Sequence, residues 1–324
     1  MMRPNKREWL AVIMLAAVWL AGCGPQSRAA GTFDRTLVVN GPVKLELTNG
    51  SGNSHITTGP VGQVQVRGEI HAQSWSAETA QKRLDEIASN PPISQEGNLI
   101  RVGAALRQMN ASVDYTIVVP VGTELRSVAG SGDVDVNGIQ GPANFVSGSG
   151  NVSASSIAGD VQVVTGSGDL KLGNIQGQLQ ATTGSGDIQI NVVNSGIRLR
   201  TGSGDLQITQ PSQNVVAETG SGDIDVKNAT ADLRLRTDSG NITVQGNPGA
   251  TNYWDLRASS GDVTLLVSPE ASFRLYAHSS SGDIDATIPV VMEATAGKHE
   301  LRARIGDGKA RVEIDTSSGK IALH

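Results

Sequence analysis

The sequence of 324 residues holds a single cysteine, Cys23, so no disulfide bond can form within the chain. Aromatic residues account for only 3% of the sequence. The histidines are His55, His71, His278, His299 and His324. They show neither the spacing of a zinc site nor a recognisable relation to a nucleophilic serine or cysteine. We therefore predict no catalytic residue, no metal ligand and no cofactor.

The charge balance is mildly acidic and lacks a basic stretch suited to nucleic acid. The net charge is −5, and removal of residues 1–22 takes away three cations and one anion, which lowers it to −7. Such a chain has no electrostatic footprint for phosphates, so we expect no nucleic-acid partner. A phosphate loop is missing too, because Gly306-Asp307-Gly308-Lys309 is followed by Ala310 instead of Ser or Thr. This stretch is predicted to form a tight hairpin turn.

An apolar run near the N-terminus indicates where in the cell the protein is located. It spans residues 9–20 and follows a stretch that contains Arg3, Lys6 and Arg7. A run of this length is short for a membrane-spanning helix, and a basic stretch before it is typical of a secretory signal. We predict a signal peptide over residues 1–22.

The residues that close this signal resemble the bacterial lipobox. They read Leu20-Ala21-Gly22-Cys23, and in a lipobox cleavage precedes the cysteine, whose thiol receives diacylglycerol. The resemblance implies lipid attachment at Cys23, membrane contact through the lipid, and a polar tether over residues 23–31. Gly24 replaces the Asp that commonly signals retention in the inner membrane, so the outer membrane is expected if the organism has two. The alternative is a cleaved, soluble secreted protein with an incidental cysteine.

A tetrapeptide, Gly-Ser-Gly-Asp or a close variant, recurs at a fixed interval through the middle of the chain. Each step is 18 residues, without insertion or deletion. A strict period of this size indicates one supersecondary unit stacked on copies of itself. We predict an all-β chain wound into a single-stranded β-solenoid (β-helix) with about 18 residues per coil. The second glycine of each corner is Gly132, Gly150, Gly168, Gly186, Gly204, Gly222 or Gly240.

Each unit contains two short stretches of alternating apolar and polar residues, as expected for strands with one buried face. In one unit the inward residues are Leu170, Leu172, Ile175, Leu179 and Ala181. So few apolar side chains cannot offset the ordering entropy of one coil, and several coils must share a core. The outward positions are mostly polar, as at Lys171, Gln189 and Arg198.

The glycine-rich corners have two interpretations. Glycine reaches the positive φ of a sharp corner without a Cβ clash, and the neighbouring Ser and Asp can hydrogen-bond the local backbone. Alternatively, stacking places one Asp or Asn of every coil in a ladder, and bound calcium would compensate its like charges. The calcium-binding nonapeptide pattern is not matched, which favours the structural interpretation. The ladder consists of Asp133, Asn151, Asp169, Asp187, Asp205, Asp223 and Asn241.

The segment before the regular repeats, residues 32–126, is predicted to hold the first coils and one helical insertion. Strands are expected over residues 37–40, 43–47, 64–70 and 114–120. The helix is expected over residues 74–88, with Ser76 as its N-cap. We interpret this helix as a cap over the open end of the first coils.

The regular repeats occupy residues 127–245, and residues 246–324 are predicted to form irregular coils and a β-rich cap. Corners recur there near Gly261, Gly282 and Gly319. Aromatic residues concentrate in this part, among them Trp254, Phe273 and Tyr276. Packing of the cap is the first interpretation of these residues, and a sugar-stacking platform is the second.

A family resemblance rests on two of these features. The strand over residues 114–120 ends in Val-Pro-x-Gly, and a run of Thr-Gly-Ser-Gly-Asp corners follows it. In both respects the chain resembles the bacterial DUF4097 and DUF2807 domains, which are described as adhesins. The resemblance extends from about residue 32 to residue 324. It implies a β-solenoid in the cell envelope and supplies no catalytic residues.

These observations favour a non-enzymatic envelope lipoprotein that presents a solenoid surface for adhesion or envelope scaffolding. Its partner would be an envelope polymer or protein, contacted at many points along the rod. A periplasmic partner in envelope-stress signalling is the alternative. A polysaccharide-active β-helix enzyme is a further one, but fold analogy cannot supply an active site. The Asp residues here fall at corners, where a structural role explains them.

Overall fold

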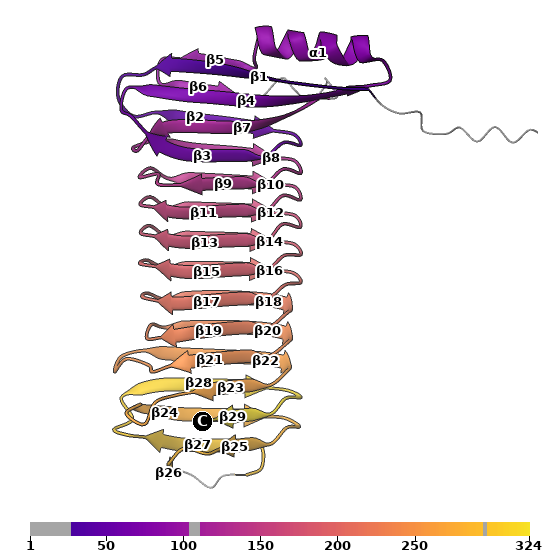
Figure 1. Cartoon of the computed structure of the whole chain (residues 1–324). Helices are drawn as coiled ribbons and strands as arrows, with labels where there is room; N and C mark the ends of the chain where they lie inside the picture. The colour runs from indigo at the N-terminus through magenta and orange to yellow at the C-terminus, as the bar shows by residue number, and fades with distance from the viewer. Residues whose placement is uncertain (1–26, 104–110, 294–296) are drawn as a thin grey trace, which may run out of the picture.

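The computed structural model describes residues 27–103, 111–293 and 297–324. The predicted signal peptide and Cys23 lie outside these residues. The described chain forms a long rod of stacked coils, built almost wholly of strands (Figure 1). Among the described residues, no helix has the length and hydropathy of a membrane-spanning segment.

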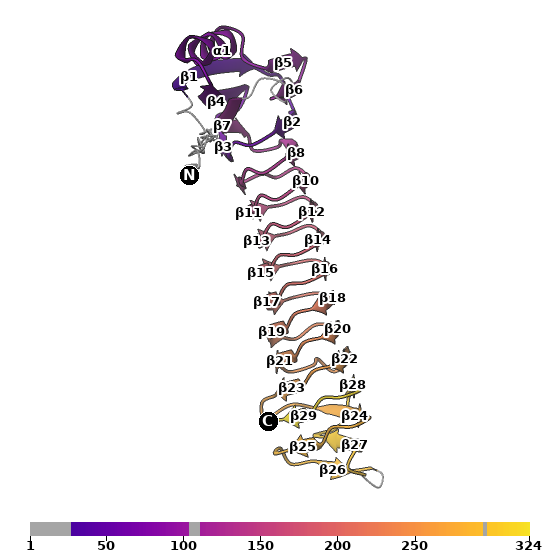
Figure 2. The same cartoon turned by 90° about the vertical axis from the view of Figure 1, so that its right-hand side faces the viewer.

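Two long sheets face each other across the core of the rod (Figure 2). Sheet A has fourteen strands, in the spatial order β1 (Ser27–Val38), β4 (Gln63–Ser74), β7 (Ala111–Pro120), β3 (Ser54–Gly59), β9 (Val134–Asn137), β11 (Val152–Ile157), β13 (Leu170–Ile175), β15 (Ile188–Val193), β17 (Leu206–Pro211), β19 (Ile224–Ala229), β21 (Ile242–Gly246), β23 (Val263–Leu266), β29 (Ile321–Leu323) and β25 (Ile284–Ala286). Sheet B has fifteen strands, in the spatial order β26 (Val291–Met292), β27 (Glu300–Ile305), β24 (Phe273–Ser279), β28 (Ala310–Thr316), β22 (Tyr253–Ser260), β20 (Leu233–Ser239), β18 (Val215–Ser221), β16 (Ile197–Thr201), β14 (Leu179–Thr183), β12 (Val161–Thr165), β10 (Ala143–Ser147), β8 (Glu124–Ala129), β2 (Lys44–Asn49), β6 (Leu99–Val102) and β5 (Ile93–Glu96).

Every coil of the regular region contributes one strand to each sheet. Partner residues in neighbouring parallel strands lie 18 apart, as in Leu170 beside Ile188 and Leu179 beside Ile197. Because the register is the same from coil to coil, each apolar position continues as a buried row along the rod. The five inward residues of the coil that spans residues 170–181 are each no more than 2% exposed. The predicted β-solenoid is confirmed.

The corner glycines are required for a different reason from the predicted one. Those from Gly132 to Gly240 do not adopt positive φ. A Cβ on Gly204 would instead overlap the carbonyl oxygen of Gly186, one coil away. Glycine is needed because the coil backbones approach each other closely here. Positive φ, between 52° and 57°, occurs near the ends of five sheet A strands, at Ser156, Asn174, Val192, Gln210 and Asn228.

Buried hydroxyl groups connect successive glycine corners. The Oγ1 atom of Thr183 donates to the carbonyl oxygen of Gly168 at 3.3 Å, and that of Thr201 donates to Gly186 at 3.2 Å. The pattern continues at Thr219 and Thr237. Because a buried hydroxyl without a partner is costly, these bonds allow a polar residue at an inward position of these four coils.

The N-terminal end of the rod is capped by a helix, as predicted, but with different boundaries. Helix α1 spans Ala77–Ser89 and begins after Ser76, whose side chain makes no capping hydrogen bond. It lies over β1 and β4 with Leu84 and Ile87 buried (Figure 1). The predicted tether of residues 23–31 is too long, because β1 starts at Ser27 and pairs with β4 along its whole length.

The coils at both ends of the rod are stacked out of chain order. The coil of β2 and β3 lies between the coil of β6 and β7 and the coil of β8 and β9. At the other end, the coil of β28 and β29 lies between the coil of β22 and β23 and the coil of β24 and β25. The first and last coils of the described chain therefore each have neighbours on both sides.

The C-terminal cap confirms one expectation and corrects two. Trp254 and Phe273 are fully buried, which agrees with cap packing. Tyr276 is only partly buried; it lies on the outer face, with the Arg302 guanidinium carbon 5.1 Å from its ring centroid. The turn at residues 306–309 is tight but closes no hairpin, because β27 and β28 pair with opposite edges of β24.

A Gly204→Ala substitution tests the close approach of the coils. The added Cβ meets the backbone of the neighbouring coil, so we expect the free energy of unfolding to fall by about 1–3 kcal/mol. Gly50→Ala is the matched control, because Gly50 belongs to the same corner motif and has open space around its Cα. Thermal denaturation followed by circular dichroism compares the two variants. Equal midpoints would contradict the steric explanation.

Candidate functional site

The predicted Asx ladder is present at the corners that lead into the sheet A strands. The Oδ1 atom of Asp205 accepts a hydrogen bond from the backbone N–H of Asp223 at 2.8 Å, and Asp223 does the same for Asn241 at 2.7 Å. Ten such bonds, of 2.7–3.1 Å, link successive coils from Asp114 to Lys320. Each side chain thus caps a backbone donor one coil further along.

The hydrogen-bonded ladder ends at a lysine, Lys320, whose corner lies between those of Asp262 and Asp283. The backbone N–H of Lys320 donates to Asp262, and its Nζ atom lies 2.6 Å from Oδ2 of Asp285. The hydrogen bond to Asp285 is the main cause that raises the pKa of Lys320, and the charges of Asp262 and Asp283 add to it. A protonated amine therefore lies among the carboxylates at this end of the ladder.

These hydrogen bonds compensate the like charges of the ladder, which is the role for which bound calcium was considered. A carboxylate that accepts a backbone N–H is stabilised by the peptide dipole, and an Asn rung offers the same acceptor without charge. In the described ranges, no group of three or more His, Cys, Asp or Glu side chains is placed to hold a metal ion. Calcium binding remains an untested alternative.

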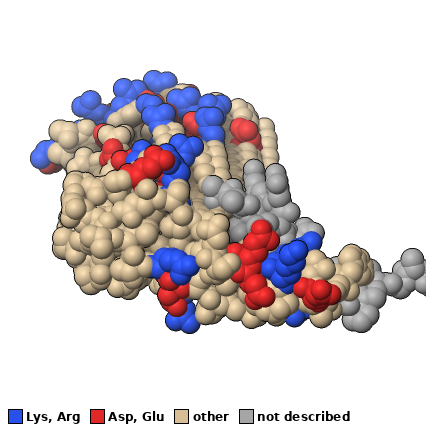
Figure 3. All heavy atoms as spheres, turned by 90° about the horizontal axis from the view of Figure 1, so that it is seen from above, with Lys and Arg blue, Asp and Glu red and all other residues tan. Residues whose placement is uncertain are grey.

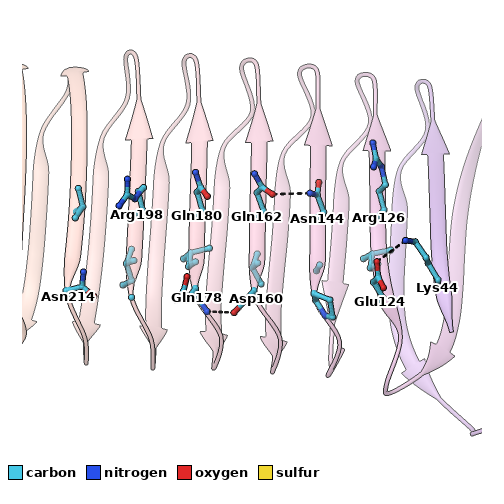
Figure 4. Close-up of a pocket in the computed structure, with 18 residues that line it drawn as sticks. Lys44, Glu124, Arg126, Asn144, Asp160, Gln162, Gln178, Gln180, Arg198 and Asn214 are labelled. Carbon is cyan, nitrogen blue, oxygen red and sulfur yellow. Dashed lines mark hydrogen bonds and ion pairs between the residues drawn. The ribbon is translucent and has the colours of Figure 1, made fainter. Parts of the chain in front are cut away.

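A second repeating surface, which the sequence analysis did not single out, lies on the outer face of sheet B. We call it the axial groove; it runs along the rod and has a volume of about 660 Å³ (Figure 4). One side is a row of outward residues from successive strands, β8 to β16: Arg126, Asn144, Gln162, Gln180 and Arg198. The other side is formed by residues at the starts of the strands from β8 to β18, among them Glu124, Asp160, Gln178 and Asn214.

The polar groups of the groove are only partly engaged with one another. Asn144 donates through Nδ2 to Oε1 of Gln162 at 3.2 Å, and Glu124 pairs with Lys44 at 3.1 Å. An amide offers both donors and an acceptor, so each coil retains groups that can bind hydroxyls. Strand spacing places these groups about 4.8 Å apart along the rod. The groove can therefore contact an extended polar chain at every coil.

The sequence of the rod matches one known protein family. Residues 113–214 and 190–324 match the model of the Toastrack DUF4097 family. The chain belongs to the Toastrack DUF4097 family. The resemblance predicted from the Val-Pro-x-Gly strand and the glycine corners is thereby confirmed. No curated protein matches this sequence.

Several solved structures are similar to this Toastrack protein over most of their length, at low identity. A "putative cell adhesion protein" from Clostridium sporogenes ATCC 15579 is 11% identical, with 90% of this chain and 99% of that chain covered and a TM-score of 0.20. A "putative lipid binding protein" from Parabacteroides distasonis ATCC 8503 is 12% identical, with 90% and 96% covered and a TM-score of 0.42. A "putative adhesin" from Bacteroides fragilis NCTC 9343 is 12% identical, with 91% and 97% covered and a TM-score of 0.33. Similarity this low carries no argument about function.

The Asx ladder can be tested at Asp205. Asp205→Ala removes the acceptor for the Asp223 N–H, and we expect the free energy of unfolding to fall by about 1 kcal/mol. Asp205→Asn keeps an oxygen there, as the natural rung Asn151 does, and should change the free energy of unfolding by less than about 0.5 kcal/mol.

Melting curves of the wild type with calcium and with a chelator should coincide. A chelator-sensitive midpoint that Asp205→Asn abolishes would show a calcium site instead.

Proposed function

We propose that this Toastrack protein is a non-enzymatic lipoprotein of the cell envelope, whose rod binds an extended envelope polymer or protein for adhesion or scaffolding. The observation that carries the proposal is the axial groove, which repeats hydrogen-bonding side chains over successive coils. Weak contacts on a rigid rod add up, because each contact after the first is intramolecular.

The chemistry of the groove supports a binding role over a catalytic one. Its carboxylates already have partners: Glu124 pairs with Lys44, and Asp160 accepts the backbone N–H of Gln178 at 2.8 Å. Both Glu124 and Asp160 are exposed to solvent, whereas a carboxyl that acts as a general acid is commonly buried in an apolar pocket. Asn, Gln and Arg make up the rest of the polar row, and these residues bind polar chains without reacting with them.

Lipid attachment at Cys23 is the part of the proposal that concerns location. Its support is the sequence alone: a basic start, an apolar run and the lipobox-like Leu20-Ala21-Gly22-Cys23. An acyl anchor would hold one end of the rod at a membrane and leave the length of the groove available to partners.

Fractionation of cells that express Cys23→Ser tests the anchor. The wild type should sediment with membranes, while the variant should be recovered in the soluble fraction, because it lacks the thiol that carries the lipid. Ala29→Ser is a control substitution outside the lipobox, and it should leave the protein in the membrane fraction. Membrane retention of Cys23→Ser would contradict lipid attachment.

Protease digestion of the rod in intact cells would favour adhesion, and protection until lysis would favour scaffolding or the signalling alternative.

A bulky side chain in the axial groove tests the binding surface. Gln180→Trp, on β14, fills the groove midway along its row of amides, and we expect at least about a tenfold loss of affinity for polymers of the envelope. Gln189→Trp is the matched control, since this exposed residue lies on β15, the next strand in the chain, on the opposite face of the rod. Co-sedimentation of the full-length protein with isolated cell walls measures binding. Equal binding by both variants would contradict the groove as the contact surface.

A further inference from the structure

Beyond the amide row, the outer face of sheet B becomes rich in arginine. Strand β16 carries Arg198 and Arg200, and strand β20 carries Arg234 and Arg236, all pointing outward. Seen along the rod from its N-terminal end, Lys and Arg side chains gather on the side of sheet B (Figure 3). We call these four residues the arginine clamp.

The register fixes the arrangement of the clamp. Strand β18 lies between β16 and β20, with Val216 between Arg198 and Arg234 and with Glu218 between Arg200 and Arg236. The two arginines of one strand are two residues apart, about 7 Å, and the two pairs are two strands apart, about 10 Å. The Cα atoms of four arginines thus form the corners of a rectangle on one flat face.

The carboxylates nearby compensate this charge only in part. Glu218 pairs with Arg200. Asp255 holds Arg257 at 2.8 Å, and Arg234 lies further from it, at 3.9 Å. Arg198 and Arg236 form no ion pair with any described residue. Clustered like charges destabilise a sheet, and a bound anion relieves that cost.

The clamp continues the axial groove. Arg198 belongs to both, because it ends the row that begins with Arg126 and continues through the amides of Asn144, Gln162 and Gln180. A ligand that follows the groove from these amides toward the C-terminal end of the rod therefore meets guanidinium groups next. Amides bind hydroxyl groups, while the planar guanidinium fork matches a carboxylate with two parallel hydrogen bonds.

We infer that the ligand of this surface is an extended acidic polysaccharide, with its hydroxyls on the amide row and its carboxylates on the arginine clamp. The inference rests on the proposed function, since it names the class of polymer that the rod would bind. A nucleic acid is a poorer match, because the clamp and the amide row offer no aromatic side chain on which bases could stack.

Binding of the full-length protein in detergent to polygalacturonate tests the inference. The fully methyl-esterified polymer is the matched ligand, since it keeps the sugar chain and loses the negative charge. We expect the acid form to bind at least about tenfold more tightly, and the double variant R198Q/R236Q to lose that advantage. The control K171Q/K227Q removes the same charge from the outer face of sheet A and should retain it.

Three results would overturn the inference. One is equal affinity for the acid and the ester, and another is the same loss in R198Q/R236Q and K171Q/K227Q. The third is tighter binding to oligothymidylate, or to vesicles of phosphatidylglycerol, than to polygalacturonate. The proposed function is judged separately by cell-wall binding. If Gln180→Trp lowers that binding and R198Q/R236Q does not, the arginine clamp fails while the proposed function stands.

Discussion

The rod depends on one constraint: coils of equal length pair through parallel strands in a constant register. Each strand hydrogen-bonds to the same residues of the next coil, so every position becomes a row. Apolar rows make the core, glycine rows let the backbones approach, threonine rows donate to the carbonyl oxygens of the glycine corners, and Asx rows cap exposed N–H groups. One inserted residue would turn an inward row outward beyond that point, which explains why the central period is strict.

The same rows decide which functional features such a protein can have. A side chain on the outer face is repeated about every 4.8 Å, so a modest contact becomes a linear array without any dedicated loop. Sheet B uses this to present amides and then arginines, whereas the corners present a row of Asp and Asn side chains. The rod therefore carries two chemically different surfaces that a partner can distinguish.

The central coils could be predicted from sequence because their alternation and spacing admit one arrangement, and residues such as Leu170 and Leu179 are buried as expected. The role of the corner glycines could not, since positive φ and close backbone approach both call for glycine. The order of the end coils was hidden as well, because Gly282 follows Gly261 in the chain but stacks on Gly319. Of the candidate surfaces, the Asx ladder could be predicted from the 18-residue period of the sequence. The axial groove was missed, although the sequence shows amide side chains at positions 144, 162 and 180, which have the same spacing.

The crossed order of the C-terminal coils has a consequence for biosynthesis. Strands β28 and β29 are translated after both of the coils that flank them in the rod. Until β28 and β29 are translated, the coil of β22 and β23 has no neighbouring coil on its C-terminal side. The coil of β24 and β25 also lacks the strands with which it pairs in the complete rod. A chain interrupted before β28 can at best form a stack with a missing rung. The C-terminal end of the rod therefore closes only after β28 and β29 have been translated.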